Sequence, residues 1–152
     1  MNKYSIGALI TGNVQLAANE ILHVAVGQKG KHNCSGNGGT FVVREKLNGS
    51  FIPIVIAGGA GGAQLEEYGN GTRAGEKNND IGKDGKTGYA HYFTGGSGYK
   101  ENRSDVTDYD PKCFTGGLHG ARRQGDTDLD GGFGGGGIAA NDAGGGGGVH
   151  RR

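Results

Sequence analysis

Short apolar runs alternate with turn-forming residues over the first 57 positions, and this pattern predicts a small antiparallel β-sheet. Glycine and asparagine separate the runs, as is typical of short strands joined by tight turns. The two pieces nearest the N-terminus are the weakest, because glycine or polar residues interrupt them. The predicted strands are 4–10, 14–16, 21–26 (ILHVAV), 40–47 (TFVVREKL) and 50–57 (SFIPIVIA).

Side-chain patterns within these runs predict how each strand lies in the sheet. The apolar residues of 21–26 do not keep to one face, so we expect that strand to be buried on both sides. Asn48-Gly49 is a hairpin signal between two runs. Pro53 lacks an N–H and indicates an edge position or a bulge. In 40–47 the residues expected to face the core are Phe41, Val43 and Leu47.

From Gly58 onward the pattern changes to glycine clusters. Glycine accounts for 36 of 152 residues, against about 7% in average proteins. Apolar residues are only 33% and tryptophan is absent, so an ordinary side-chain core is hard to build. Extended polyglycine backbones can satisfy one another when packed closely, as only glycine permits; flexible linkers are the alternative. The expected core of such polyglycine-II-type helices is Gly58, Gly59, Gly61, Gly62, Gly131, Gly132, Gly134, Gly135, Gly136, Gly137, Gly144, Gly145, Gly146, Gly147 and Gly148.

The chain therefore divides into a β-strand portion, 1–57, and a glycine-rich portion, 58–152, which we expect to pack as one composite domain. Residues 64–87 and 97–130 are polar and predict insertions or long loops. Tyr89 to Phe93 could form a short strand, and Asn37 to Gly39 predicts a turn. The predicted fold class is mainly β, with short antiparallel strands, a polyglycine bundle and long loops.

Charge and motif content argue against several functions. The net charge of +1 gives no basic excess for nucleic acid. No apolar run is long enough to span a membrane, and the N-terminus lacks the pattern of a secretion signal. Glycine turns near 58–62 and 85–87 resemble nucleotide-binding loops, but neither completes its motif. No nucleophile–base pair has the spacing that catalysis needs, so we expect no enzyme.

The cysteines and one acidic stretch are the candidate chemical sites. Cys34 and Cys113 match no zinc spacing. They could form a disulfide that closes a loop of about 80 residues and stabilises by about 4 kcal/mol, or remain two thiols. Asp126, Asp128 and Asp130 have the spacing of the first half of a calcium loop. Gly137 stands where the bidentate glutamate is expected, so a solvated acidic turn is the alternative, and no other cofactor is indicated.

Four Asn-X-Ser/Thr sequons favour an extracellular chain, although such strings also form ordinary turns. Their asparagines, the predicted glycosylation sites, are Asn33, Asn48, Asn70 and Asn102.

The order of several segments resembles a known family. A strand followed by Val26-Gly-Gln-Lys-Gly30 and Cys34, then GGTFVV at 38–43, PIVIAGGAGGA at 53–63 and the glycine runs of 131–148 are similar to the extracellular glycine-rich domain of the anaplastic lymphoma kinase and leukocyte tyrosine kinase receptors. Uncharacterised glycine-rich secreted proteins share the pattern. The resemblance implies a composite of a partial tumour-necrosis-factor-like β-sandwich and hydrogen-bonded polyglycine helices. It also implies a role in binding extracellular proteins, but no ligand-contact residues carry over.

Two functional hypotheses follow. In the first, the chain is a non-enzymatic extracellular module whose rigid polyglycine scaffold presents loops 64–87 and 97–130 to a protein or glycan. In the second, it is a structural, self-assembling protein of a cell or virion surface, such as a filament subunit or adhesin tip, with strand addition between copies. An open edge at Pro53, and the expectation that the chain begins after the leading strands of such domains, favour the second. Partners are thus an extracellular ligand or other copies.

Overall fold

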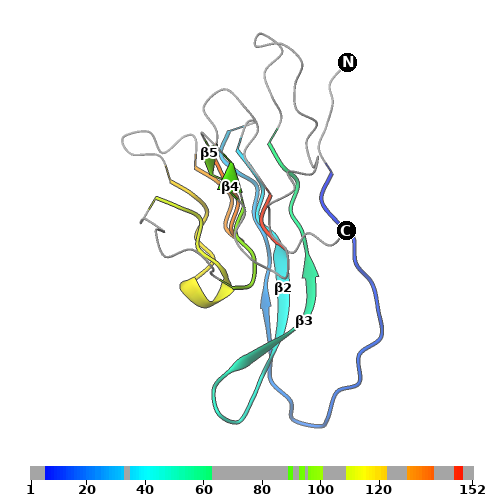
Figure 1. The fold of residues 1–152 in the computed structure, drawn as a ribbon. Helices are drawn as coiled ribbons and strands as arrows, with labels where there is room; N and C mark the ends of the chain where they lie inside the picture. The colour runs from blue at the N-terminus through cyan, green and yellow to red at the C-terminus, as the bar shows by residue number, and fades with distance from the viewer. Residues whose placement is uncertain are drawn as a thin grey trace.

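A computed structural model describes the molecule at residues 6–32, 35–62, 89–90, 93–94, 96–100, 109–122, 130–138 and 146–148. A slender three-stranded sheet runs along the molecule, and several extended segments gather beside its upper end (Figure 1). The structure is mainly β, as the sequence predicts.

The sheet is antiparallel, with the strand order β1-β2-β3. Its strands are β1 (Leu22–Ala25), β2 (Thr40–Glu45) and β3 (Phe51–Ala57). All three fall inside the predicted runs, whereas the described residues of 4–10 and 14–16 form no strand. Where the sequence predicts one short strand at 89–93, the structure has two two-residue strands, β4 (Tyr89–Ala90) and β5 (Phe93–Thr94), which pair with each other. One 3-10 helix spans Phe114–Gly116. A β-sandwich stays a prediction.

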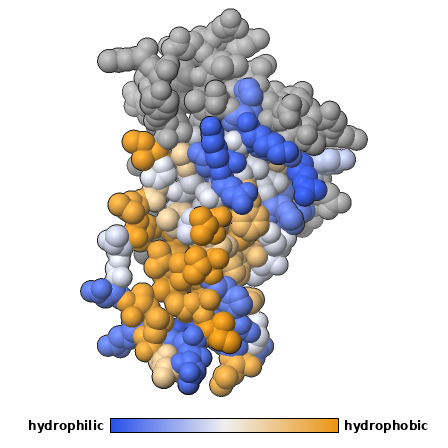
Figure 2. Space-filling view, turned by 180° about the vertical axis from the view of Figure 1, so that it is seen from behind, coloured by the Kyte–Doolittle hydropathy of each residue, from blue (hydrophilic) through white to orange (hydrophobic). Residues whose placement is uncertain are grey.

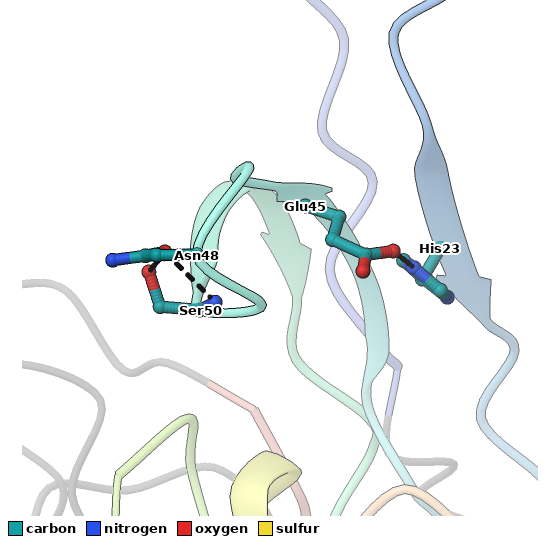
Figure 3. A network of polar contacts seen from close by, with 4 residues as sticks. All are labelled: His23, Glu45, Asn48 and Ser50. Atoms are coloured by element: carbon teal, nitrogen blue, oxygen red, sulfur yellow. Dashed lines mark hydrogen bonds and ion pairs between the residues drawn. The ribbon is translucent and has the colours of Figure 1, made fainter.

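A tight hairpin joins β2 to β3 at Asn48-Gly49, as predicted. The Gly49 N–H donates to the Lys46 carbonyl at 2.9 Å, and Gly49 has a φ of 74°. A left-handed residue that ends a three-residue loop normally has to be glycine. The Asn48 side-chain oxygen accepts from both the N–H and the hydroxyl of Ser50, at 3.1 and 2.7 Å (Figure 3). These bonds fix the register of the two strands.

Pro53 lies on an edge strand and also beside a bulge, the two settings in which a residue without an N–H is tolerated. It belongs to β3, which pairs with β2 and with no other described strand. The register also shifts here, because Val42 pairs with Val55 whereas Val43 pairs with Pro53. Ile54 therefore forms a bulge. The edge position and the bulge are both confirmed.

The core lies on one face of the sheet. Phe41 and Val43 are fully buried there, as predicted, together with Tyr99 and Leu118 from the second half of the chain. The ring of Phe114 packs between those of Phe41, Phe51 and Tyr99, with centroids 5.5 to 5.9 Å apart. Leu47 does not join this core. It is fully exposed in the hairpin loop, because the strand ends at Glu45.

The prediction that residues 21–26 are buried on both sides is wrong. Ile21, Val24 and Val26 each expose about 60% of their surface. The reason is the strand order, which places β1 at an edge of the sheet. The face of β1 opposite to the core has no layer of described side chains over it. An apolar run thus lies at an exposed edge instead of the centre of the fold.

Candidate binding surface

Beyond the upper end of the sheet, glycine-rich segments bond to one another through their backbones. We call this set the glycine array. At its centre lies segment 35–39, in which the sequence predicts a turn at 37–39, whereas the structure has no turn there. It exchanges hydrogen bonds of 2.8 to 3.0 Å with four other segments, which contain Gln28, Ala60, Gly132 to Gly137, and Gly147. A strand in a sheet bonds to at most two neighbours in one plane, so the array is not a sheet.

Many glycines of the array have no room for a side chain. A Cβ placed on Gly38 would overlap the Phe133 carbonyl, and one on Gly39 would lie 2.7 Å from the Gly147 oxygen. Contacts of this kind hold the backbones at a distance that only glycine permits. The array glycines at which a Cβ would come closer than 3.0 Å to another backbone are Gly27, Gly30, Gly38, Gly39, Gly59, Gly96, Gly120, Gly131, Gly132, Gly134, Gly135, Gly136, Gly146, Gly147 and Gly148.

The array includes part of the predicted glycine core and also glycines that were not predicted. Gly59, Gly131 to Gly137 and Gly146 to Gly148 were expected from the sequence, whereas Gly144 and Gly145 lie outside the described residues. Gly27, Gly30, Gly36 to Gly39, Gly96 and Gly120 were missed as members. Single and paired glycines outside the long glycine runs are the signal that could have found them.

One end of the array gathers chain segments that are distant in sequence. The Lys31 N–H donates to the Asp130 carbonyl at 2.9 Å, and the Arg122 N–H donates to the Tyr109 carbonyl at 2.8 Å. Gly131 bonds to Ala121 at 2.9 Å and so joins the two pairs. We call this surface, made of Lys31, Tyr109, Arg122 and Asp130, the loop end. In the sequence, Arg122 and Asp130 flank the polar stretch 123–129, and Tyr109 follows 101–108.

Three of the four side chains of the loop end are exposed, whereas only 16% of the Asp130 side chain is exposed. Tyr109 exposes 46% of its surface, and Arg122 is exposed as well. The Lys31 ammonium lies 3.3 Å from the Asp130 carboxylate. Exposed tyrosine and arginine side chains are typical of surfaces that bind proteins. The array beneath holds the backbone of all four residues in place.

The described parts of the expected insertion 97–130 belong to the fold. Cys113, Leu118 and Ala121 are buried, and the Ala121 N–H bonds to the Gly136 carbonyl at 2.8 Å. The Tyr99 hydroxyl donates to the Phe51 carbonyl at 2.7 Å, and burial raises the pKa of Tyr99 above 10.0. The described parts of this range are therefore not free loops.

The predicted site residues fall in different places. Asp130 pairs with Lys31, whereas Asp126 and Asp128 lie outside the described residues. No group of three or more metal-ligating side chains occurs in the described ranges, and calcium stays a prediction. Cys113 is a buried free thiol 3.2 Å from the Thr115 hydroxyl. Cys34 lies outside the described residues, so the disulfide finds no support and stays a prediction.

Glycosylation also stays a prediction. Asn48 is exposed in the hairpin, where its side-chain oxygen bonds to Ser50. Asn33, Asn70 and Asn102 lie outside the described residues.

A second surface is apolar. From behind, apolar side chains gather over the lower half of the molecule (Figure 2). Residues 6–20, which we call the N-terminal arm, contribute many exposed apolar groups. The arm is held by the Ala8 N–H on the Gly58 carbonyl and by Arg44 on the Gln15 carbonyl, both at 2.8 Å. The exposed large apolar residues of the arm and β1 region are Ile6, Leu9, Ile10, Val14, Leu16, Ile21, Val24 and Val26.

Comparison with known proteins does not place the chain in a family. No protein-family model and no curated protein matches it. The resemblance to the receptor glycine-rich domain therefore stays a prediction. Within the described residues, no helix has the length and apolar character needed to cross a membrane.

Proposed function

We propose that this chain is a non-enzymatic extracellular interaction module. In this proposal the glycine array is a bundle of polyglycine-II-type helices, and the loop end binds a protein or a glycan. The observation that carries the proposal is the convergence of Lys31, Tyr109, Arg122 and Asp130 on one hydrogen-bonded end of the array. A binding surface on a rigid backbone loses little conformational entropy when a ligand binds.

Both parts of the proposal have physical support. Bonding to neighbours in several directions is a property of packed polyglycine helices, whose N–H and C=O groups point outward. Binding residues are often placed on loops that a rigid scaffold positions. The exposed Tyr109 ring can pack on an apolar ligand face, and the exposed Arg122 guanidinium can donate hydrogen bonds to the ligand.

Binding of the fluorescently labelled chain to a glycan array and to intact cells tests this proposal. Tyr109→Ala and Arg122→Ala should each weaken any binding at least tenfold, and replacement of 123–129 by a Gly-Ser stretch should abolish it. Leu47→Ala is the matched control, because Leu47 is exposed on the hairpin, away from the array. Equal binding by all variants would contradict the loop end as the site. Repeating the assay with a calcium chelator tests the predicted calcium loop.

The second candidate function is a structural, self-assembling surface protein, such as a filament subunit or adhesin tip. The exposed apolar groups of the N-terminal arm and β1 favour it, because apolar surface of this kind usually marks a contact with another protein. Size-exclusion chromatography over a range of protein concentrations tests this function. Concentration-dependent assembly is expected, and a monomer at every concentration would contradict it.

A further inference from the structure

The two edges of the three-stranded sheet differ in how they are protected. At the β3 edge, Pro53 has no N–H to offer, and the register shift interrupts the strand. The Tyr99 hydroxyl bonds to the Phe51 carbonyl, and the arm bonds to the Gly58 carbonyl just beyond the strand. Prolines, bulges and covering segments are the usual means of preventing strand addition. The β3 edge, although it holds the predicted edge proline, is therefore guarded.

Along residues 22–26 the β1 edge has none of these devices; the Gln28 N–H donates to the Phe133 carbonyl at 2.8 Å, but this bond lies beyond Val26. Because the Glu45 N–H bonds to the Ile21 carbonyl, alternation along the ladder directs the backbone groups of His23 and Ala25 toward β2. Those of Leu22, Val24 and Val26 are directed outward. No described residue bonds to these outward groups. The side chains of Val24 and Val26 are exposed as well, and no proline or lysine occurs between 21 and 26.

We propose that β1 pairs with the β1 strand of a second copy of this chain, in antiparallel orientation about a two-fold axis at Val24. This register pairs all three outward residues, with Val24 opposite Val24 and Leu22 opposite Val26. The alternative centred on His23 would pair Leu22 with Val24 and leave Val26 without a partner in the other β1 strand. Cross-strand contacts between β-branched side chains stabilise such pairs.

Charge at the two ends of β1 favours the same orientation. Glu20 precedes the strand, and the exposed Lys29 follows it. The Glu20 carboxylate already pairs with Arg44 of its own copy at 2.8 Å, so antiparallel pairing brings Lys29 to an end without net positive charge, whereas parallel pairing would align the two exposed lysines. The occupant that this edge fits is therefore a second copy of itself.

This inference and the second candidate function both rest on self-association, but they predict different assemblies. A two-fold contact is isologous and closes on itself, so it gives a dimer, whereas a filament needs a contact that repeats. Analytical ultracentrifugation distinguishes these outcomes. The wild-type chain should show a monomer–dimer equilibrium whose average mass doubles with rising concentration.

Val24→Pro tests the edge directly. The Val24 N–H is directed outward, so proline should leave the β1–β2 ladder intact and remove only a donor to the added strand. Val24→Lys adds a charge of the kind that guards natural edges. Both variants should remain monomers, with far-ultraviolet circular dichroism like that of the wild type. Leu9→Lys is the matched control, because Leu9 is more exposed than Val24 but lies in the arm, and it should still dimerise.

Cysteine cross-linking tests the register. In the proposed dimer the two Val24 Cα atoms are a hydrogen-bonded pair about 5.5 Å apart, which a disulfide can bridge. Val24→Cys should therefore give a covalent dimer as the main product of mild oxidation. Val26→Cys, which faces Leu22, should give no more dimer than the wild-type chain with its native cysteines.

Each alternative outcome overturns the inference in a distinct way. A wild-type monomer at every concentration would overturn both this inference and the second candidate function. Open-ended polymers that persist in Val24→Pro would support the second candidate function and overturn the β1 contact. A dimer that survives both Val24 variants would overturn the inference, as would equal cross-linking of Val24→Cys and Val26→Cys.

Discussion

Replacement of Gly38 by alanine is the sharpest test of the glycine array. Gly38 is buried, and its new Cβ would overlap the Phe133 carbonyl and lie 2.7 Å from the Gly134 Cα. To make room, segment 132–134 must move away from 38–39. That movement strains two bonds, from Gln28 to the Phe133 carbonyl at 2.8 Å and from Gly39 to the Gly134 carbonyl at 2.9 Å.

The expected cost follows from these contacts. Overpacking in a well-packed interior costs about 1–3 kcal/mol, and each lost hydrogen bond adds about 1 kcal/mol. Gly38→Ala should therefore lower the free energy of unfolding by about 3–5 kcal/mol, a large part of the roughly 5–15 kcal/mol that a domain has. The melting temperature should fall by about 6–20 °C.

Equilibrium unfolding in urea measures the change, with the midpoint and slope compared between variants. Gly12→Ala is the matched control, because a Cβ at Gly12 meets nothing within 4 Å. It should be neutral, or stabilising by about 0.4–1 kcal/mol through the unfolded chain. If Gly38→Ala were as stable as Gly12→Ala, the close approach of the backbones would be refuted.

Three further predictions concern other parts of the fold. Gly49→Ala should cost about 1–2 kcal/mol in urea unfolding, because φ is 74° although the space around it is open; Gly49→Asn should cost less. Tyr99→Phe should cost about 1 kcal/mol at neutral pH through the lost bond to Phe51. Because burial raises the pKa of Tyr99 above 10.0, the folded state holds its proton more tightly than the unfolded state. Wild-type stability should be unaffected by this group below pH 10 and fall above it, and a smaller fall is expected in Tyr99→Phe. Thiol titration without reductant tests the cysteines: the predicted disulfide leaves no thiol after unfolding, whereas two reactive thiols would contradict it.

The strands were predictable because their signals are local. Val43 lies two residues after Phe41, Gly49 follows asparagine, and Pro53 cannot donate within a ladder. Each of these properties acts within a few residues. The ends of the strands were less predictable. Leu47 continues the apolar alternation of β2 but lies in the hairpin, because the loop has three residues rather than two.

Strand order and long-range packing were not predictable in the same way. Val24 and Val26 suit a buried strand, and only their place at the sheet edge leaves them exposed. Asn37-Gly38-Gly39 has the composition of a turn. Its conformation in the structure depends instead on backbone partners that are distant in sequence, such as Ala60 and Gly134. No local pattern reports contacts between segments so distant in sequence.

Native-state amide hydrogen exchange on the intact, unreduced chain tests the central claim most directly. If the glycine segments are a packed, hydrogen-bonded array, the amides of Gly38, Gly59, Gly132 and Gly147 should be as strongly protected as those of β2. The amide of Gly12, for which the structure shows no bond, should exchange at once. Immediate exchange of the four array glycines, with protection confined to the sheet, would contradict the array and the proposed functions built on it.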